Sequence, residues 1–273
     1  MPPSLGTGLR AAATQAVPGR AFAAVMRAVY PRLEPELACL ATWAPRGGTA
    51  VDVGAWYGPW TVRLSRLAGQ VVSIEPNPAL AAAVRAGCPA AQVVEAAASD
   101  HDGTARLWLP PGGRGAEGTA SLEHAVYPGH AASSSHGDPL RKAGAAENAG
   151  RFITVRRVTI DGLGLTGVRF IKMDIEGHET AALRGAEQTI KRDAPMLMLE
   201  LETRHQPIDD VIGTLAGWGY QGEVLAGRSW VPLPAFDLAA HQAANAHVAA
   251  RGMLGRLARP GERYINLVRF QRT

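Results

Sequence analysis

Cysteine is scarce in this chain of 273 residues, which holds only Cys39 and Cys88. Two cysteines cannot form the disulfide framework of a small secreted domain, so the simplest expectation is a reducing cytoplasm. No apolar run reaches the roughly eighteen residues that a membrane-spanning helix needs. The net charge of +4 is carried almost wholly by arginine, and no run of basic residues marks a nucleic-acid groove. We therefore expect a cytoplasmic protein without a transmembrane segment or a nucleic-acid partner.

The length is sufficient for one α/β domain with additions and does not require two domains. The first thirty residues are rich in alanine and arginine, and we predict an N-terminal helical appendage at residues 1–45 and the main domain at residues 46–273. Arg10, Arg20 and Arg27 lie among apolar residues on a loosely amphipathic helix, which could cover the sheet, a partner subunit or lipid. A homo-oligomer or a peripheral contact through this helix is left open.

The stretch that organises the chain is Thr49–Thr61, with the sequence T-A-V-D-V-G-A-W-Y-G-P-W-T. Its short β-branched run predicts a buried parallel strand, and Gly54 and Gly58 bracket a turn where the backbone passes close to a ligand. A dinucleotide-binding turn would carry G-x-G-x-x-G and place a pyrophosphate at the helix N-terminus. Here the middle glycine is missing, and the carboxylate of Asp52 would repel phosphate. A ligand with a cationic end and a ribose fits better, and S-adenosylmethionine is such a molecule.

A second apolar run, Val71–Glu75, ends in an acid about twenty residues after the first turn. In a doubly wound sheet, this is the place of the carboxylate that hydrogen-bonds ribose hydroxyls. The Pro-Asn-Pro sequence that follows stops the strand and starts the next helix. Glu75 is therefore the predicted ribose ligand.

The rest of the chain alternates between short apolar runs and helical patterns. Further strands are expected at residues 92–98, 104–109, 152–160, 168–175, 196–201, 221–226 and 264–270. Repeated β-α units predict a mostly parallel sheet whose ligands bind at the carboxyl ends of the strands. Acids gather at or just past the predicted strand ends, namely Asp52, Glu75, Asp100, Asp174, Glu176 and Glu200. This clustering favours a cationic, ribose-bearing cofactor.

Residues 110–150 form a long segment that is dense in Gly, Ala, Ser and Pro. Loops of this length are uncommon in compact domains and are usually functional lids or disordered segments. Since the chain re-enters the sheet directly afterwards, we predict a lid or flexible insertion over the site.

Residues 171–186, I-K-M-D-I-E-G-H-E-T-A-A-L-R-G-A, resemble the K-x-D-x-E-G-x-E-x-x-x-L-x-G-A signature of the FkbM-type S-adenosylmethionine-dependent methyltransferases. This family belongs to the class I, Rossmann-like methyltransferases. D-V-G-A-W-Y-G-P-W-T resembles the family's cofactor loop, and E-P-N-P resembles its ribose-binding strand end. The resemblance covers roughly Thr49–Glu200. Two positions depart from the usual pattern, which has Asn where Trp56 stands and a small residue where His178 stands.

The resemblance implies a seven-stranded, mostly parallel sheet with an antiparallel last strand and helices on both faces. It also implies methylation of a hydroxyl on a small molecule such as a sugar, a glycolipid or a polyketide-type natural product. With the residue patterns above, it predicts a cofactor site made of Asp52, Gly54, Ala55, Trp56, Tyr57, Gly58, Thr61, Glu75, Pro76, Asn77, Ser99, Asp100 and Asp174.

An alkyl hydroxyl has a pKa near that of water, roughly 15.7, so a base or a metal must take its proton during attack. Asp174 ends a predicted strand, and Glu176 and His178 follow within the same turn. We hypothesise that Asp174 positions the cofactor or the acceptor and that His178 or Glu176 removes the proton. Alternatively, the two carboxylates only cap the helix that follows. A divalent metal on Asp100, Asp174 and His178 is compatible with this chemistry, but nothing in the spacing requires one.

Other functions compete with an O-methyltransferase. An NAD-type dehydrogenase is disfavoured by the missing middle glycine. A nucleic-acid methyltransferase needs a pocket for a flipped base and typically ends this strand in a proline-rich, aromatic motif, whereas this chain has D-I-E-G. A catalytically inactive methyltransferase-like scaffold or interaction domain stays open.

Overall fold

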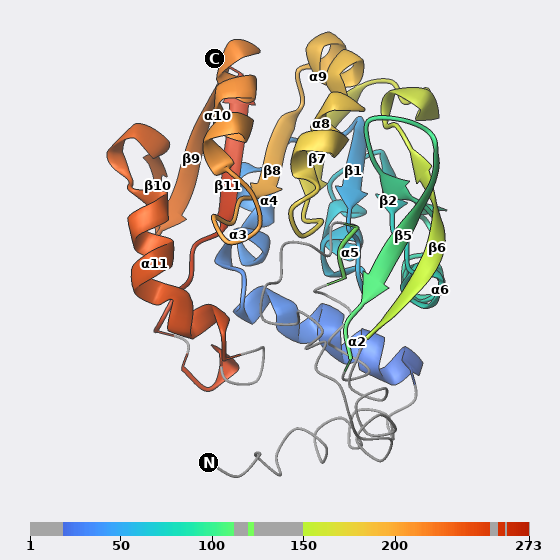
Figure 1. The fold of residues 1–273 in the computed structure, drawn as a ribbon, viewed down its shortest axis with the longest axis horizontal. Coiled ribbons are helices and arrows are strands. Elements are labelled where there is room, and N and C mark those ends of the chain that lie inside the picture. The colour runs from blue at the N-terminus through green and yellow to red at the C-terminus, as the bar shows by residue number, and fades with distance from the viewer. Residues whose placement is uncertain (1–18, 112–119, 123–149, 252–255, 260, 273) are drawn as a thin grey trace, which may run out of the picture.

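The computed structural model describes residues 19–111, 120–122, 150–251, 256–259 and 261–272. Its centre is an eight-stranded sheet with the order β10-β9-β11-β8-β7-β1-β2-β3 (Figure 1). These strands are β1 (Thr49–Val53), β2 (Gln70–Ile74), β3 (Gln92–Val94), β7 (Val168–Met173), β8 (Met196–Glu200), β9 (Tyr220–Ala226), β10 (Ser229–Pro232) and β11 (Leu267–Arg272).

Five neighbouring strands of this sheet, β3, β2, β1, β7 and β8, run parallel. Strand β11 lies between β8 and β9 and is antiparallel to both, so the predicted mostly parallel sheet with an antiparallel last strand is confirmed. Strand β10 is an addition to the seven strands that the family resemblance implies. It pairs with β9 because Gly227, at φ +65°, and Arg228 close a tight antiparallel hairpin.

Side chains of the central strands alternate between two hydrophobic layers, as strands buried on both faces require. In β1, Val51 and Val53 belong to one layer and Ala50 to the other. Helices α8 (Glu179–Arg184), α9 (Glu187–Asp193), α10 (Ile208–Gly217) and α11 (Leu238–Ala249) contribute to the first layer, and α3 (Pro35–Ala38), α4 (Leu40–Trp43) and α5 (Pro59–Leu64) contribute to the second. The predicted helices on both faces are therefore confirmed.

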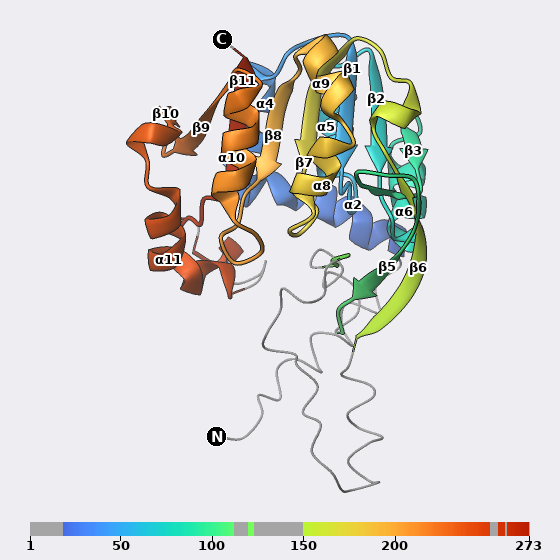
Figure 2. The ribbon, with the colours of Figure 1, turned by 45° about the horizontal axis from the view of Figure 1, so that its top comes forward.

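A second sheet of three strands has the order β4-β6-β5, with β4 at Ala97–Ala98, β5 at Gly103–Leu109 and β6 at Arg151–Val158. The prediction placed residues 92–98 in one strand, but the structure divides them between β3 and β4, which belong to different sheets. Figure 2 shows β5 and β6 extending past the carboxyl ends of the central strands. The lid predicted at residues 110–150 falls mainly on residues 112–119 and 123–149, which lie outside the described residues.

The N-terminal helix α2 (Gly19–Val29) lies across the carboxyl ends of the central strands (Figures 1 and 2). Its Phe22 is buried with Tyr57 of the glycine turn and with Leu80 of α6 (Pro78–Gly87), the helix that follows β2. The Arg27 Nη1 group donates a hydrogen bond to the Tyr57 carbonyl at 3.1 Å. The predicted helix therefore covers the domain itself, while a domain boundary near residue 45 stays a prediction.

The remaining helical elements are α6 (Pro78–Gly87), η1 (Tyr30–Arg32), η5 (Asp161–Leu163) and η6 (Leu233–Ala235). Within the described ranges, no helix combines the length and the apolar character that crossing a membrane requires.

Gly185, where α8 meets α9, allows a close backbone contact, because a Cβ there would lie 1.9 Å from the Ser99 carbonyl oxygen. We expect Gly185→Ala to lower the free energy of unfolding by about 1–3 kcal/mol, since the backbone must move to admit the methyl group. The matched control is Gly213→Ala in α10, where nothing lies within 4 Å of a Cβ. Helix propensity predicts a gain of up to about 1 kcal/mol there. Urea denaturation of both variants measures the difference, and equal stabilities would contradict it.

Candidate active site

A cavity of about 310 Å³ opens at the carboxyl ends of β1, β2, β7 and β8. The predicted site residues that line it are Gly54, Ala55, Trp56, Glu75, Pro76, Asp174, Glu176 and His178. The other predicted residues lie behind or beside this wall, namely Asp52, Tyr57, Gly58, Thr61, Asn77, Ser99 and Asp100. Glu200, another acid of the predicted cluster, also lines the cavity, so acids from the ends of β2, β7 and β8 come together. Direct cofactor contacts of the residues outside the wall stay predictions.

The glycine turn after β1 brings two strand ends into contact. Gly54 has φ +74°, and a Cβ there would lie 2.0 Å from the Asp174 carbonyl oxygen. Trp56 also adopts a left-handed conformation, with φ +51°, although this region is costly for a bulky side chain. Asparagine is enriched in this conformation, which explains the family pattern at this position. The turn ends at Gly58, with φ +81°, from which α5 begins at Pro59.

Glu75 is fixed at the end of β2 by two backbone groups. Its Oε2 accepts a hydrogen bond from the Trp56 N–H and its Oε1 accepts one from the Asn77 N–H, both at 2.9 Å. Burial raises the pKa of Glu75 to about 7, and these hydrogen bonds oppose the rise. The carboxylate therefore has one orientation, and it joins the glycine turn to the start of α6.

Lys172 lies in the cavity wall between the buried Asp52 and the partly exposed Asp174, and the site prediction missed it. Its Nζ donates a hydrogen bond to the Gly54 carbonyl at 2.8 Å and lies 3.4 Å from Asp174 Oδ2 and 3.7 Å from Asp52 Oδ1. Burial lowers the pKa of Lys172, but the charges of Asp174 and Asp52 outweigh it and raise the pKa above its usual value. The available signal was the lysine of the I-K-M-D segment, which precedes Asp174 by two residues.

The side chain of Asp52 is fully buried and does not line the cavity. Its Oδ2 accepts a hydrogen bond from Thr61 Oγ1 at 2.6 Å, and Thr61 in turn contacts Ser73 Oγ at 2.9 Å. Burial raises the pKa of Asp52, and Lys172 opposes the rise. In this structure Asp52 fixes α5 and Lys172 against β1.

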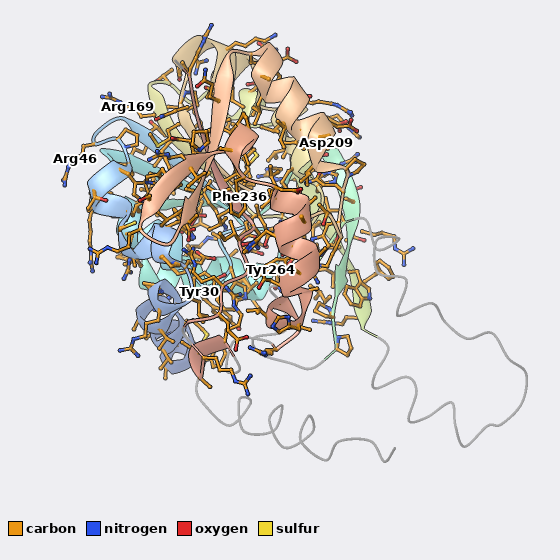
Figure 3. All side chains as sticks on the ribbon, turned by 90° about the vertical axis from the view of Figure 1, so that its left-hand side faces the viewer. Tyr30, Arg46, Arg169, Asp209, Phe236 and Tyr264 are labelled. Atoms are coloured by element: carbon orange, nitrogen blue, oxygen red, sulfur yellow. The ribbon has the colours of Figure 1, made fainter. Side chains whose placement is uncertain are left out.

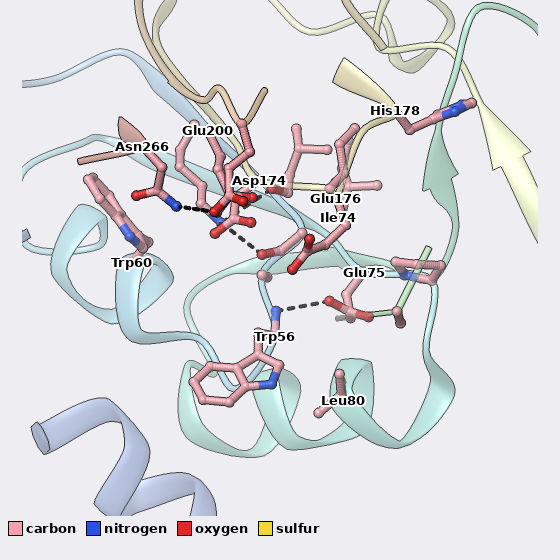
Figure 4. Close-up of a pocket in the computed structure, with 18 of the residues that line it drawn as sticks. Trp56, Trp60, Ile74, Glu75, Leu80, Asp174, Glu176, His178, Glu200 and Asn266 are labelled. Atoms are coloured by element: carbon pink, nitrogen blue, oxygen red, sulfur yellow. Dashed lines mark hydrogen bonds and ion pairs between the residues drawn. The ribbon is translucent and has the colours of Figure 1, made fainter. Parts of the chain in front are cut away.

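Carboxylates gather on the opposite side of the cavity from Glu75. Figure 4 shows Asp174, Glu176 and Glu200 close together, with Asn266 beside them. Asn266 Nδ2 donates hydrogen bonds to Glu200 at 2.5 Å and to Glu202 at 3.1 Å. Burial raises the pKa of Glu200 well above its usual value, and the charges of Asp174, Glu176 and Glu202 add to the rise.

His178 lies apart from these carboxylates. Figure 4 shows its imidazole pointing away from Asp174 and Glu176, and its Nε2 lies 3.1 Å from Ser99 Oγ. Asp100 contacts His101 Nδ1 at 2.5 Å on the exposed surface. The trio of Asp100, Asp174 and His178 that the sequence offered for a metal is therefore not gathered around one point.

The two ends of the described chain complete the cavity wall. Tyr30 and Leu33 come from the N-terminal segment, and Arg256, Tyr264 and Asn266 come from the C-terminal segment. Figure 3 shows Tyr30 and Tyr264 at the same end of the molecule.

The N-terminal wall is joined to the glycine turn and to α5. The rings of Tyr30 and Trp56 are 5.3 Å apart, and Trp60 Nε1 donates a hydrogen bond to Glu34 Oε2 at 2.7 Å. Burial, followed by the charge of Asp174, raises the pKa of Glu34 to about 7. Sequence reasoning missed these walls because no local motif marks them.

Comparison with known proteins gives one family. The model of the methyltransferase FkbM domain matches residues 52–221. A search of curated proteins found no match.

Three solved structures have low similarity to this chain. An FkbM methyltransferase from Methylobacillus flagellatus KT is 17% identical, with a TM-score of 0.46, over 69% of this chain and 43% of that one. A TehB-like SAM-dependent methyltransferase from Corynebacterium glutamicum is 14% identical, with a TM-score of 0.40, over 75% and 84% of the two chains. A precorrin-6y C5,15-methyltransferase from Geobacter metallireducens is 12% identical, with a TM-score of 0.39, over 73% and 80%.

This chain therefore spans less than half the length of the Methylobacillus protein. The family match covers more than half of this chain, and it includes the glycine turn, Glu75 and the Asp174 strand end. The chain belongs to the FkbM family of S-adenosylmethionine-dependent methyltransferases.

Proposed function

We propose that this methyltransferase is an O-methyltransferase for a hydroxyl of a small molecule, such as a sugar, a glycolipid or a polyketide-type natural product. The observation that supports the proposal is a cavity with an apolar side next to Glu75 and an acidic side around Asp174. The free thiols of Cys39 and Cys88 support a cytoplasmic setting.

The residues present fit S-adenosylmethionine. Ile74, Leu80 and Ala97 line the apolar side and suit an adenine ring. Glu75 keeps lone pairs for ribose hydroxyls after accepting its two backbone hydrogen bonds. Trp56 Nε1 is buried without a hydrogen-bond partner among the described residues, which suits an oxygen of a ligand. When bound, the cofactor supplies a methyl group on a positively charged sulfonium, which the acidic side of the cavity favours.

On the acidic side, we assign to Asp174 the positioning of the acceptor hydroxyl. Its side chain is 22% exposed, and Lys172 at 3.4 Å fixes the carboxylate at the strand end. As the acceptor oxygen bonds to the methyl carbon, the electron pair of the carbon–sulfur bond stays on sulfur, and the hydroxyl proton passes to a base. Asp174 and Glu176 share this side, whereas His178 points away from it (Figure 4). We therefore assign the proton to one of the two carboxylates.

The test is incubation with S-adenosylmethionine and a panel of hydroxylated small molecules, followed by mass spectrometry. We expect one acceptor to gain a methyl group on oxygen, with an equal amount of S-adenosylhomocysteine. Methylation at nitrogen, carbon or sulfur of the acceptor would contradict the O-methyl assignment.

Cofactor binding is expected to depend on pH through Glu75. Its pKa is raised to about 7, and the ionised carboxylate is the form that accepts ribose hydroxyls. Protonation below this pKa should weaken the affinity for S-adenosylmethionine about tenfold between pH 8 and pH 6. Calorimetric titration at several pH values measures the slope.

The control for this pH dependence is Glu75→Gln, which keeps the shape of the side chain and removes the ionisable group. Partly buried Glu34 and buried Glu179 also have pKa values raised to about 7, so only this substitution isolates Glu75. We expect a flat pH profile for the variant. A slope equal to that of the unmodified protein would assign the titration to another group.

A further inference from the structure

Three side chains with metal-binding atoms meet on the acidic side of the cavity. Glu176 follows β7, Glu200 ends β8, and His205 lies in the turn after β8. One ligand atom of each lies within 4.8 Å of the other two. We propose that Glu176, Glu200 and His205 bind a divalent cation.

The ligand atoms are held in place by the fold. His205 has a side chain only 5% exposed, and its Nδ1 lies 3.1 Å from Glu176 Oε2. Its Nε2 lies 3.8 Å from Glu202 Oε2. Nδ1 therefore faces the proposed ligand Glu176, while Glu202 contacts the other ring nitrogen, and a carboxylate in that position commonly orients a metal-binding histidine.

Glu200 has an oxygen that the described residues leave unsatisfied. Asn266 Nδ2 donates to Oε1, but Oε2 is buried and accepts no hydrogen bond from them. Buried polar atoms without a partner are rare and costly, and a bound cation would satisfy this one.

The nearby basic side chains form ion pairs with carboxylates other than Glu200. Lys172 is bound by Asp174, Asp52 and the Gly54 carbonyl, and Arg204 pairs with Glu202. Within the described part of the chain, no lysine or arginine forms an ion pair with Glu200. Glu200 therefore has no lysine or arginine partner among the described residues, and its Oε2 is left for a cation to contact.

A donor set of two carboxylates and one imidazole suits Mn²⁺ or a similar first-row ion better than Ca²⁺, which prefers oxygen ligands alone. The role of the cation depends on the proposed function. Next to Asp174, it would lower the pKa of the acceptor hydroxyl, and with Glu176 engaged, the proton would pass to Asp174. With a cation bound, Glu176 would act as a metal ligand and Asp174 would act as the base, whereas without it either carboxylate can take the proton.

The test is titration of the full chain, freed of metal by chelation, with Mn²⁺, followed by calorimetry and electron paramagnetic resonance. We expect one equivalent to bind, and Glu200→Gln and His205→Ala to weaken binding at least about tenfold. The matched control is Glu262→Gln, which alters an exposed Glu–His pair whose His247 Nε2 lies 3.4 Å away. Unchanged affinity in the two site variants, or no binding by the unmodified chain, would overturn the proposal.

Two further measurements test the metal site and the O-methyl assignment independently of each other. Retained binding of S-adenosylmethionine shows that each variant is folded, and if both variants unfold, the titration of the unmodified chain decides. Bound Mn²⁺ without methylation of any hydroxyl would support the site and contradict the O-methyl assignment. Undiminished methyl ether formation in excess chelator, with no Mn²⁺ bound on titration, would support that assignment and overturn the site.

Discussion

Lys172→Met is expected to lower the free energy of unfolding by about 3–5 kcal/mol, because it leaves the buried Asp52 and the partly exposed Asp174 without their cation. Lys172 is almost fully buried, 3.4 Å from Asp174 Oδ2 and 3.7 Å from Asp52 Oδ1. The Gly54 carbonyl also loses the hydrogen bond that it accepts from Nζ. Guanidinium chloride denaturation, with the unfolding slope compared between variants, measures the loss.

Two further variants check the cause. Lys191→Met removes an exposed lysine that pairs with Glu187 at 2.5 Å, and we expect a loss of only about 0.3–0.5 kcal/mol. Adding Asp52→Asn to Lys172→Met should recover part of the lost stability, since it removes one of the uncompensated charges. Equal losses for the two lysine variants would show that Lys172 does not compensate these carboxylates.

Asp174→Asn is expected to reduce turnover by about 10²–10⁴-fold, the usual contribution of a positioned acid–base group. The substitution keeps the size of the side chain and removes its capacity to take a proton. Turnover is measured from methylated product, and cofactor affinity is measured separately by calorimetry. If Asp174 instead positions the cofactor, affinity falls along with turnover.

Glu176→Gln and His178→Ala are compared under the same conditions. We expect Glu176→Gln to lower turnover and His178→Ala to leave it largely intact, because His178 points away from the acidic side. Asp209→Asn, in the exposed first turn of α10, serves as a control that should retain full activity. Normal turnover in all three site variants would remove the acceptor-side hypothesis.

The central sheet could be predicted because its signals are local. β1, β2 and β7 are short apolar runs that end in a glycine turn or an acid, and parallel pairing brings those ends together. The hairpin of β9 with β10 depends on one turn of two residues, and the division of residues 92–98 depends on which sheet each half joins. A short apolar run indicates a strand but does not indicate which other strand it pairs with.

The sequence predicted which strand-end turns form the candidate site. It predicted less well which side chains of these turns face the cavity. Side chains alternate along a strand, so Asp52 lies on the same face of β1 as Ala50. Its side chain therefore enters the hydrophobic layer to which α5 contributes. Glu75 follows the last residue of β2 and can turn toward the cavity. The walls formed by Tyr30 and Tyr264 come from segments far apart in sequence, and only tertiary packing brings them together.

The most direct test of this account is a crystal structure of the protein with S-adenosylmethionine bound. We expect the ribose hydroxyls at Glu75, the adenine beside Leu80, and the sulfonium methyl group facing Asp174. A ligand bound outside this cavity, or a cavity left empty at saturating ligand, would contradict the account.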